Sequence, residues 1–153
     1  MRRQRSNIFE DGGDSMPLYA AILMLLGILL TSVLAFGYLF KVKNLISYHL
    51  GMNIAMTSAG TGGLAIGAVL GAWLYNYSTL AVVAATLLAI AIGAVFGSLV
   101  DYQTVVTGIT SGVMSGLMGP MLGMHMQDPI LIAAFCTLAA CLSFVLLCVS
   151  VRA

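Results

Sequence analysis

The sequence predicts an all-α integral membrane protein with five transmembrane helices in an antiparallel, up-and-down order. The 153-residue chain is 61% hydrophobic and only 7% charged, which is far from the composition of a soluble domain. Five apolar runs follow one another, each near the ~20 residues that cross ~30 Å of hydrocarbon. The composition excludes a soluble enzyme, a nucleic-acid binder that depends on basic patches, and a disordered chain.

The five runs are bounded by charged or turn-forming residues. They extend over about residues 17–40, 50–75, 79–100, 104–125 and 129–150, after a charged tail at residues 1–16. An unpaired charge is costly in hydrocarbon, so charges are expected only outside the runs. Beyond the tail, the charged residues all lie there: Lys41, Lys43, Asp101, Asp128 and Arg152.

Turns of three residues join the last four runs, at residues 76–78, 101–103 and 126–128. Turns this short make consecutive helices antiparallel neighbours. Ser78, Asp101 and Asp128 are expected to cap the helices that follow them, and Pro129 suits a first helical turn. For the two aspartates, a place at the mouth of an ion path is the alternative.

The charge pattern gives a weak orientation. Three arginines of the tail lie on one side of the membrane, and Lys41, Lys43 and Arg152 lie on the other. Because the two lysines directly follow the first run, we expect the lysine side to be cytoplasmic. The length of that run and the mixed charge before it favour an uncleaved helix over a signal peptide.

Small residues recur every four positions in the three central runs. Residues four apart lie on nearly one helical face, so each row leaves a groove of bare backbone. Such grooves let helices approach closely in lipid, so the sequence predicts a glycine-zipper core inside a bulkier first and fifth helix. The predicted packing glycines are Gly63, Gly67, Gly71, Gly93, Gly97, Gly108, Gly112, Gly116, Gly119 and Gly123.

The fourth run carries two such rows. One is Gly108-Gly112-Gly116, and the other is Ser111-Ser115-Gly119-Gly123. Two rows exceed what one neighbouring helix requires. The excess predicts a contact with another protomer or a different subunit, and thus a homo-oligomer or a larger membrane complex. Use of both rows within the chain is the alternative.

Methionines and histidines of the second and fourth runs suggest a different function. Within each run they recur at spacings of three and four, so each set shares a helical face. Thioether and imidazole suit Cu(I), and around a shared axis the two sets would form a ladder for a soft cation. The alternative is that methionine fills gaps beside the glycine rows. The residues are His49, Met52, Met56, Met114, Met118, Met121 and His125.

The Met52-x-x-x-Met56 and Met114-x-x-x-Met118 pairs, among helices with GxxxG rows, resemble the eukaryotic-type copper transporters, in which a Met-x-x-x-Met helix precedes a GxxxG helix. The resemblance implies copper passage through the membrane, and it covers only these few residues. This chain differs in having five spans rather than three, and the GxxxG of its third run lies far from the first methionine pair.

The sequence offers no candidate residues for charge-driven transport or for catalysis. No Asp, Glu, Lys or Arg lies inside a run, so a proton relay, a charged coupling site and a voltage sensor are not expected. The sequence shows no nucleophile–base pair, zinc-ligand spacing or phosphate loop. It therefore predicts a non-enzymatic membrane subunit that acts by helix association and needs no cofactor. The alternative is a small passive transporter or channel, with Cu(I) as the most specific candidate substrate.

Overall fold

The computed structural model describes residues 17–42 and 48–151, which fold into five long helices and one short 3-10 helix. All five long helices have the length and apolar composition to cross a membrane. This confirms the prediction of an all-helical, multi-pass membrane protein. The predicted tail at residues 1–16, Lys43 and Arg152 lie outside the described residues. The elements are α1 (Leu18–Val42), α2 (Tyr48–Trp73), η2 (Tyr75–Tyr77), α3 (Ser78–Gly97), α4 (Tyr102–His125) and α5 (Pro129–Ser150).

The helix ends show which cap predictions were right. Asp101 caps α4, since its Oδ1 accepts a hydrogen bond from the Tyr102 N–H at 2.7 Å. Pro129 lies in the first turn of α5, as predicted. Asp128 occupies the N-cap position of α5 as predicted, but its side chain makes no cap hydrogen bond. The Ser78 cap is wrong, because α3 already begins at Ser78.

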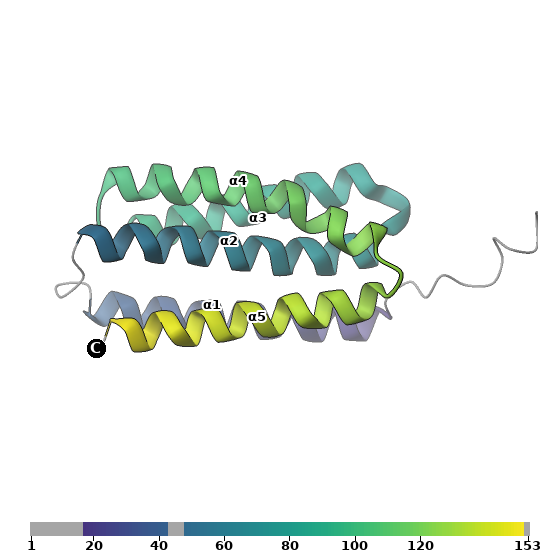
Figure 1. Ribbon diagram of the computed structural model, residues 1–153, viewed down its shortest axis with the longest axis horizontal. Helices are drawn as coiled ribbons and strands as arrows, with labels where there is room; N and C mark the ends of the chain where they lie inside the picture. The colour runs from purple at the N-terminus through teal and green to yellow at the C-terminus, as the bar shows by residue number, and fades with distance from the viewer. Residues whose placement is uncertain (1–16, 43–47, 152–153) are drawn as a thin grey trace, which may run out of the picture.

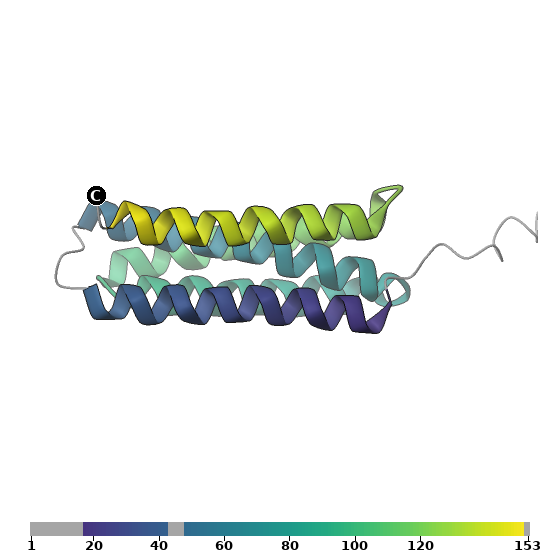
Figure 2. The same cartoon turned by 90° about the horizontal axis from the view of Figure 1, so that it is seen from below.

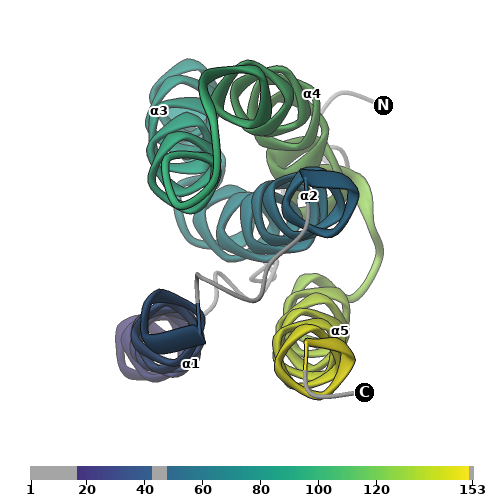
Figure 3. The ribbon, with the colours of Figure 1, turned by 90° about the vertical axis from the view of Figure 1, so that its left-hand side faces the viewer.

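Helix α2 lies at the centre of the bundle. It contacts each of the other four long helices. Viewed end-on, α3 and α4 lie on one side of it and α1 and α5 on the other (Figure 3). Successive helices run in opposite directions along the long axis, so α2 and α4 run the same way (Figures 1 and 2).

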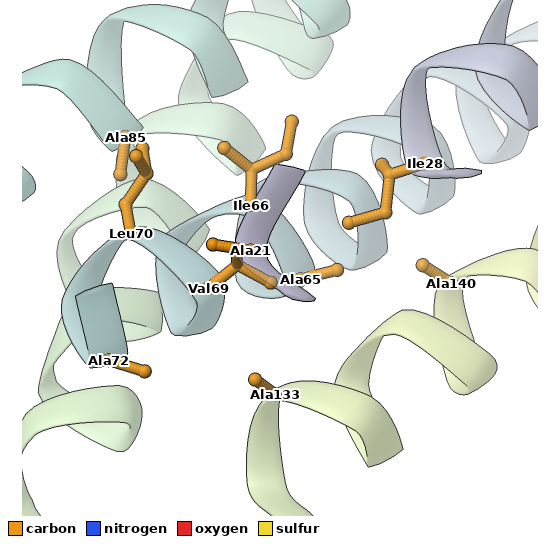
Figure 4. Close-up of a cluster of buried hydrophobic side chains, with 10 residues drawn as sticks. All are labelled: Ala21, Ile28, Ala65, Ile66, Val69, Leu70, Ala72, Ala85, Ala133 and Ala140. Atoms are coloured by element: carbon orange, nitrogen blue, oxygen red, sulfur yellow. The ribbon is translucent and has the colours of Figure 1, made fainter. Parts of the chain in front are cut away.

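The core on the α1 and α5 side of α2 is built from small side chains. Alanines of α1, α2 and α5 gather around Ile28 and Val69, both fully buried (Figure 4). Nearer the other end of the bundle, aromatic rings replace the alanines. Phe96 of α3 packs edge-on against Phe36 of α1, with ring centroids 5.6 Å apart, and lies 5.9 Å from the ring of Phe144 of α5. These rings connect three helices that do not follow one another in the chain.

Candidate functional site

The ten predicted packing glycines are all buried. The first row of α4 faces α3. A Cβ atom at Gly112 would lie 2.6 Å from the carbonyl oxygen of Ala89, and one at Gly116 would lie 2.5 Å from the Cα of Thr86. Real Cβ atoms essentially never come this close to other heavy atoms, so here the backbones of α3 and α4 touch directly.

The second row of α4 faces α2. A Cβ atom at Gly67 would lie 2.7 Å from the Cα of Gly119, and one at Gly119 would lie 2.8 Å from the Cα of Gly67. One turn further on, a Cβ atom at Gly123 would lie 2.7 Å from the backbone nitrogen of Ala72. Both rows are therefore used within the chain, so the excess of rows on α4 is no evidence for an outside partner.

Two serines of the same row hold α4 to α2 where the glycine contact ends. The Ser111 hydroxyl donates to the Met56 carbonyl at 3.0 Å, and the Ser115 hydroxyl donates to the Ala59 carbonyl at 2.9 Å. Most other threonine and serine hydroxyls of the helices donate to a carbonyl of their own helix, as Thr61 does to Thr57. The sequence showed that these serines share a face with the glycines but did not show which carbonyls accept.

Replacing Ser115 with Ala is expected to lower the stability of the bundle modestly. The change removes the bond to Ala59 while leaving a side chain that fits, and such bonds between membrane helices contribute ~0.6 kcal/mol on average. Ser143→Ala is the matched control, because Ser143 donates only to Ala139 of its own helix. Equal loss of stability in the two variants, measured by thermal unfolding in detergent, would contradict a role for Ser115 between helices.

The predicted metal residues lie on the outside of the chain. The five methionine side chains are 37% to 69% exposed, with Met114 the most exposed, and both histidines are exposed. His125 Nδ1 lies 3.2 Å from the carbonyl oxygen of Met121, one helical turn away. Within the described ranges, no three His, Cys, Asp or Glu residues group to hold a metal ion. The structure does not gather the methionines around an enclosed axis, and the soft-metal ladder stays a prediction.

Two apolar grooves flank α1. One, of about 230 Å³, lies between α1 and α3 beside Ser32 and Phe36. The other, of about 300 Å³, lies between α1 and α5 beside Thr31 and Phe144. Neither is lined by a residue of α2 or α4, so neither enters the contact among the three inner helices.

No protein-family model, curated protein or solved structure matches this chain. Its function is therefore inferred from burial, polarity and contacts.

Helix α4 combines a low mean hydropathy with a small buried share. The mean hydropathy of its membrane window is 1.3, close to the 1.4 of α2 and well below the 2.4 to 2.7 of α1, α3 and α5. Yet 72% of the α2 window is buried and only 33% of the α4 window. The buried glycines and Ser115 account for much of the low hydropathy of α4. Its uncovered surface is mostly Val, Leu and Met but also carries the polar side chains of Gln103 and Thr110, which makes that surface the best candidate for a functional contact.

Proposed function

We propose that the chain is a non-enzymatic membrane subunit that acts by associating, through its helices, with another membrane protein chain. The observation that carries this proposal is the exposure of α4. The small-residue rows of α4 are covered by α3 and α2, while its other side is uncovered and carries the exposed hydroxyl of Thr110 among apolar side chains. A partner helix on the outer side would complete its burial.

The close contact of α2, α3 and α4 supports a packing role over a transport role. We interpret the small-residue rows as a glycine zipper that makes the three inner helices one rigid unit. Backbone contact at Gly67, Gly112 and Gly116 leaves no room for a solute between these helices. Outward methionines do not form a passage through a single chain. Binding of a partner needs only a rigid helix surface, which this packing provides.

The proposed orientation places the Lys41 end of the bundle in the cytoplasm. Lys41 is exposed and lies in the last turn of α1, where a basic residue next to hydrocarbon favours the cytoplasmic side.

The mass of the protein in its native membrane tests the proposal. Extraction with a styrene–maleic acid copolymer keeps the chain in native lipid, and light scattering then gives the protein mass of each particle. We expect at least twice the 16.0 kDa of one chain. Particles that hold a single chain and no other protein, at expression levels near the natural one, would contradict a role as a subunit.

A further inference from the structure

Exposed polar side chains are rare in the middle of these helices. Leaving aside the first and last turns, the described residues include only two exposed Asn, Gln, Ser, Thr or charged side chains, Asn53 of α2 and Thr110 of α4. The corresponding exposed positions of α1, α3 and α5 carry aliphatic or aromatic side chains or small Gly and Ala. Thr110 and Asn53 are therefore the two exceptions among mid-helix outer faces of the described residues, and only Thr110 lies on α4.

Thr110 belongs to a stripe on α4 that we call the outer seam. Its members alternate at spacings of four and three residues, and all are exposed or half-buried. An average spacing of 3.5 is that of two helices winding around each other with a small crossing angle. The rows that face α2 and α3 instead have a spacing of four. The outer seam consists of Gln103, Thr107, Thr110, Met114, Leu117 and Met121.

We infer that the outer seam is the contact with a second copy of this chain, with the two α4 helices side by side and parallel. This inference rests on the proposed function and names its partner. A two-fold axis along the membrane normal brings each residue opposite its own copy at the same depth. A seam that meets itself must then be self-complementary.

The chemistry of the seam meets that requirement. A threonine hydroxyl both donates and accepts hydrogen bonds, so where two copies of Thr110 meet, one hydroxyl can turn from its own Thr107 carbonyl and donate to the oxygen of the other. Helix α4 contains no Asp, Glu, Lys or Arg, so two copies do not repel each other through these charges. Met114 and Met121 supply flexible apolar side chains that adapt to a facing copy.

The seam also suits a chain that inserts first and pairs later. The Thr110 hydroxyl donates to the Thr107 carbonyl at 2.9 Å, and the Thr107 hydroxyl donates to the Gln103 carbonyl at 2.9 Å. No donor of these two hydroxyls is left unmet in the single chain, while their oxygens can still accept. The second copy then adds packing along the whole helix.

Cysteine crosslinking in native membranes tests the inference. The three natural cysteines, all in α5, are first replaced by alanine. Thr110→Cys and Met114→Cys are then introduced singly and oxidised. The control is Leu87→Cys on α3, which is 63% exposed. It lies at the depth of Met114, because Thr86 packs on Gly116 and Ala89 on Gly112.

We expect both seam variants to form a crosslinked dimer at least tenfold more than the control, with melting temperatures equal to that of the cysteine-free parent. Equal crosslinking at Leu87 would indicate random collision and overturn the inference. A crosslink from the outer seam to a different protein would overturn the inference that the partner is a second copy, but it would support the proposed subunit function. No seam crosslink in stably folded variants would overturn the seam, and if native-lipid particles also held one chain, the proposed function would fail with it.

Discussion

Replacing Gly93 with Leu is expected to prevent the three inner helices from packing. A Cβ atom at Gly93 would collide with the carbonyl group of Gly108 on α4 and would lie 3.0 Å from the Cβ of Ala59 on α2. The obstacle is mainly backbone, which cannot rotate away as a side chain can. Forcing a larger side chain into a filled contact costs ~1–3 kcal/mol and sometimes more, and we expect the upper end of that range or beyond. Thermal unfolding of the purified protein in detergent measures the loss.

Gly37→Leu is the matched control for this prediction. A Cβ atom at Gly37 would meet nothing within 4 Å, and glycine within a helix is less favourable than alanine by ~1 kcal/mol. We therefore expect the melting temperature of this variant to stay unchanged or to rise. If Gly93→Leu melted at the same temperature as Gly37→Leu, direct backbone contact between α3 and α4 would be refuted.

Phe96→Ala is expected to have the second-largest effect, because it removes the middle ring of the cluster that joins α1, α3 and α5. Phe96 is 2% exposed and contacts the rings of Phe36 and Phe144. Truncation leaves a cavity that the flanking helices can close only by moving, and Phe→Ala changes in protein cores cost ~3–5 kcal/mol. Since lipid is itself apolar, the loss here comes from packing alone, and we expect the lower end of that range.

Phe135→Ala on α5 is the matched control, because this ring is 64% exposed and makes few contacts within the chain. Its loss is expected to change the melting temperature of the single chain by no more than a degree or two. An equal effect of the two substitutions would show that the ring cluster does not hold α1 and α5 to the inner helices.

The number and extent of the helices could be predicted from the sequence because both depend on local properties. Hydropathy over ~20 residues and the placement of charges decide where a chain crosses a bilayer. The predicted ends agree with the structure to within three residues. The largest difference is at the end of α3, which stops at Gly97 rather than at Val100. Residues 98–100 instead form a turn, with the Val100 N–H bonded to the Gly97 carbonyl at 3.3 Å.

The neighbours of each helix face could not be predicted, because periodicity identifies a face but not what covers it. The two rows of α4 indicated two contacts, and only the folded chain shows that α3 and α2 make them. The outward position of Met121, in contrast, could have been predicted from the sequence. Met121 is nine residues from Gly112, and nine steps of ~100° make two and a half turns, so the two residues lie on opposite sides of the helix. Glycine facing inward on α4 therefore requires Met121 to face outward.

Helices α2 and α4 touch through bare backbone at Gly67 and Gly119. A Cβ atom at Gly67 would lie 2.7 Å from the Cα of Gly119, and a carbon–carbon bond adds ~1.5 Å, so the two Cα atoms lie no more than ~4.2 Å apart. Solid-state NMR of the protein in lipid bilayers, with ¹³C at glycine Cα only, measures this distance directly. We expect a strong cross-peak between Gly67 and Gly119 at short mixing times. Absence of this cross-peak in spectra that do show cross-peaks between glycines one turn apart in one helix, such as Gly67 and Gly71, would contradict it.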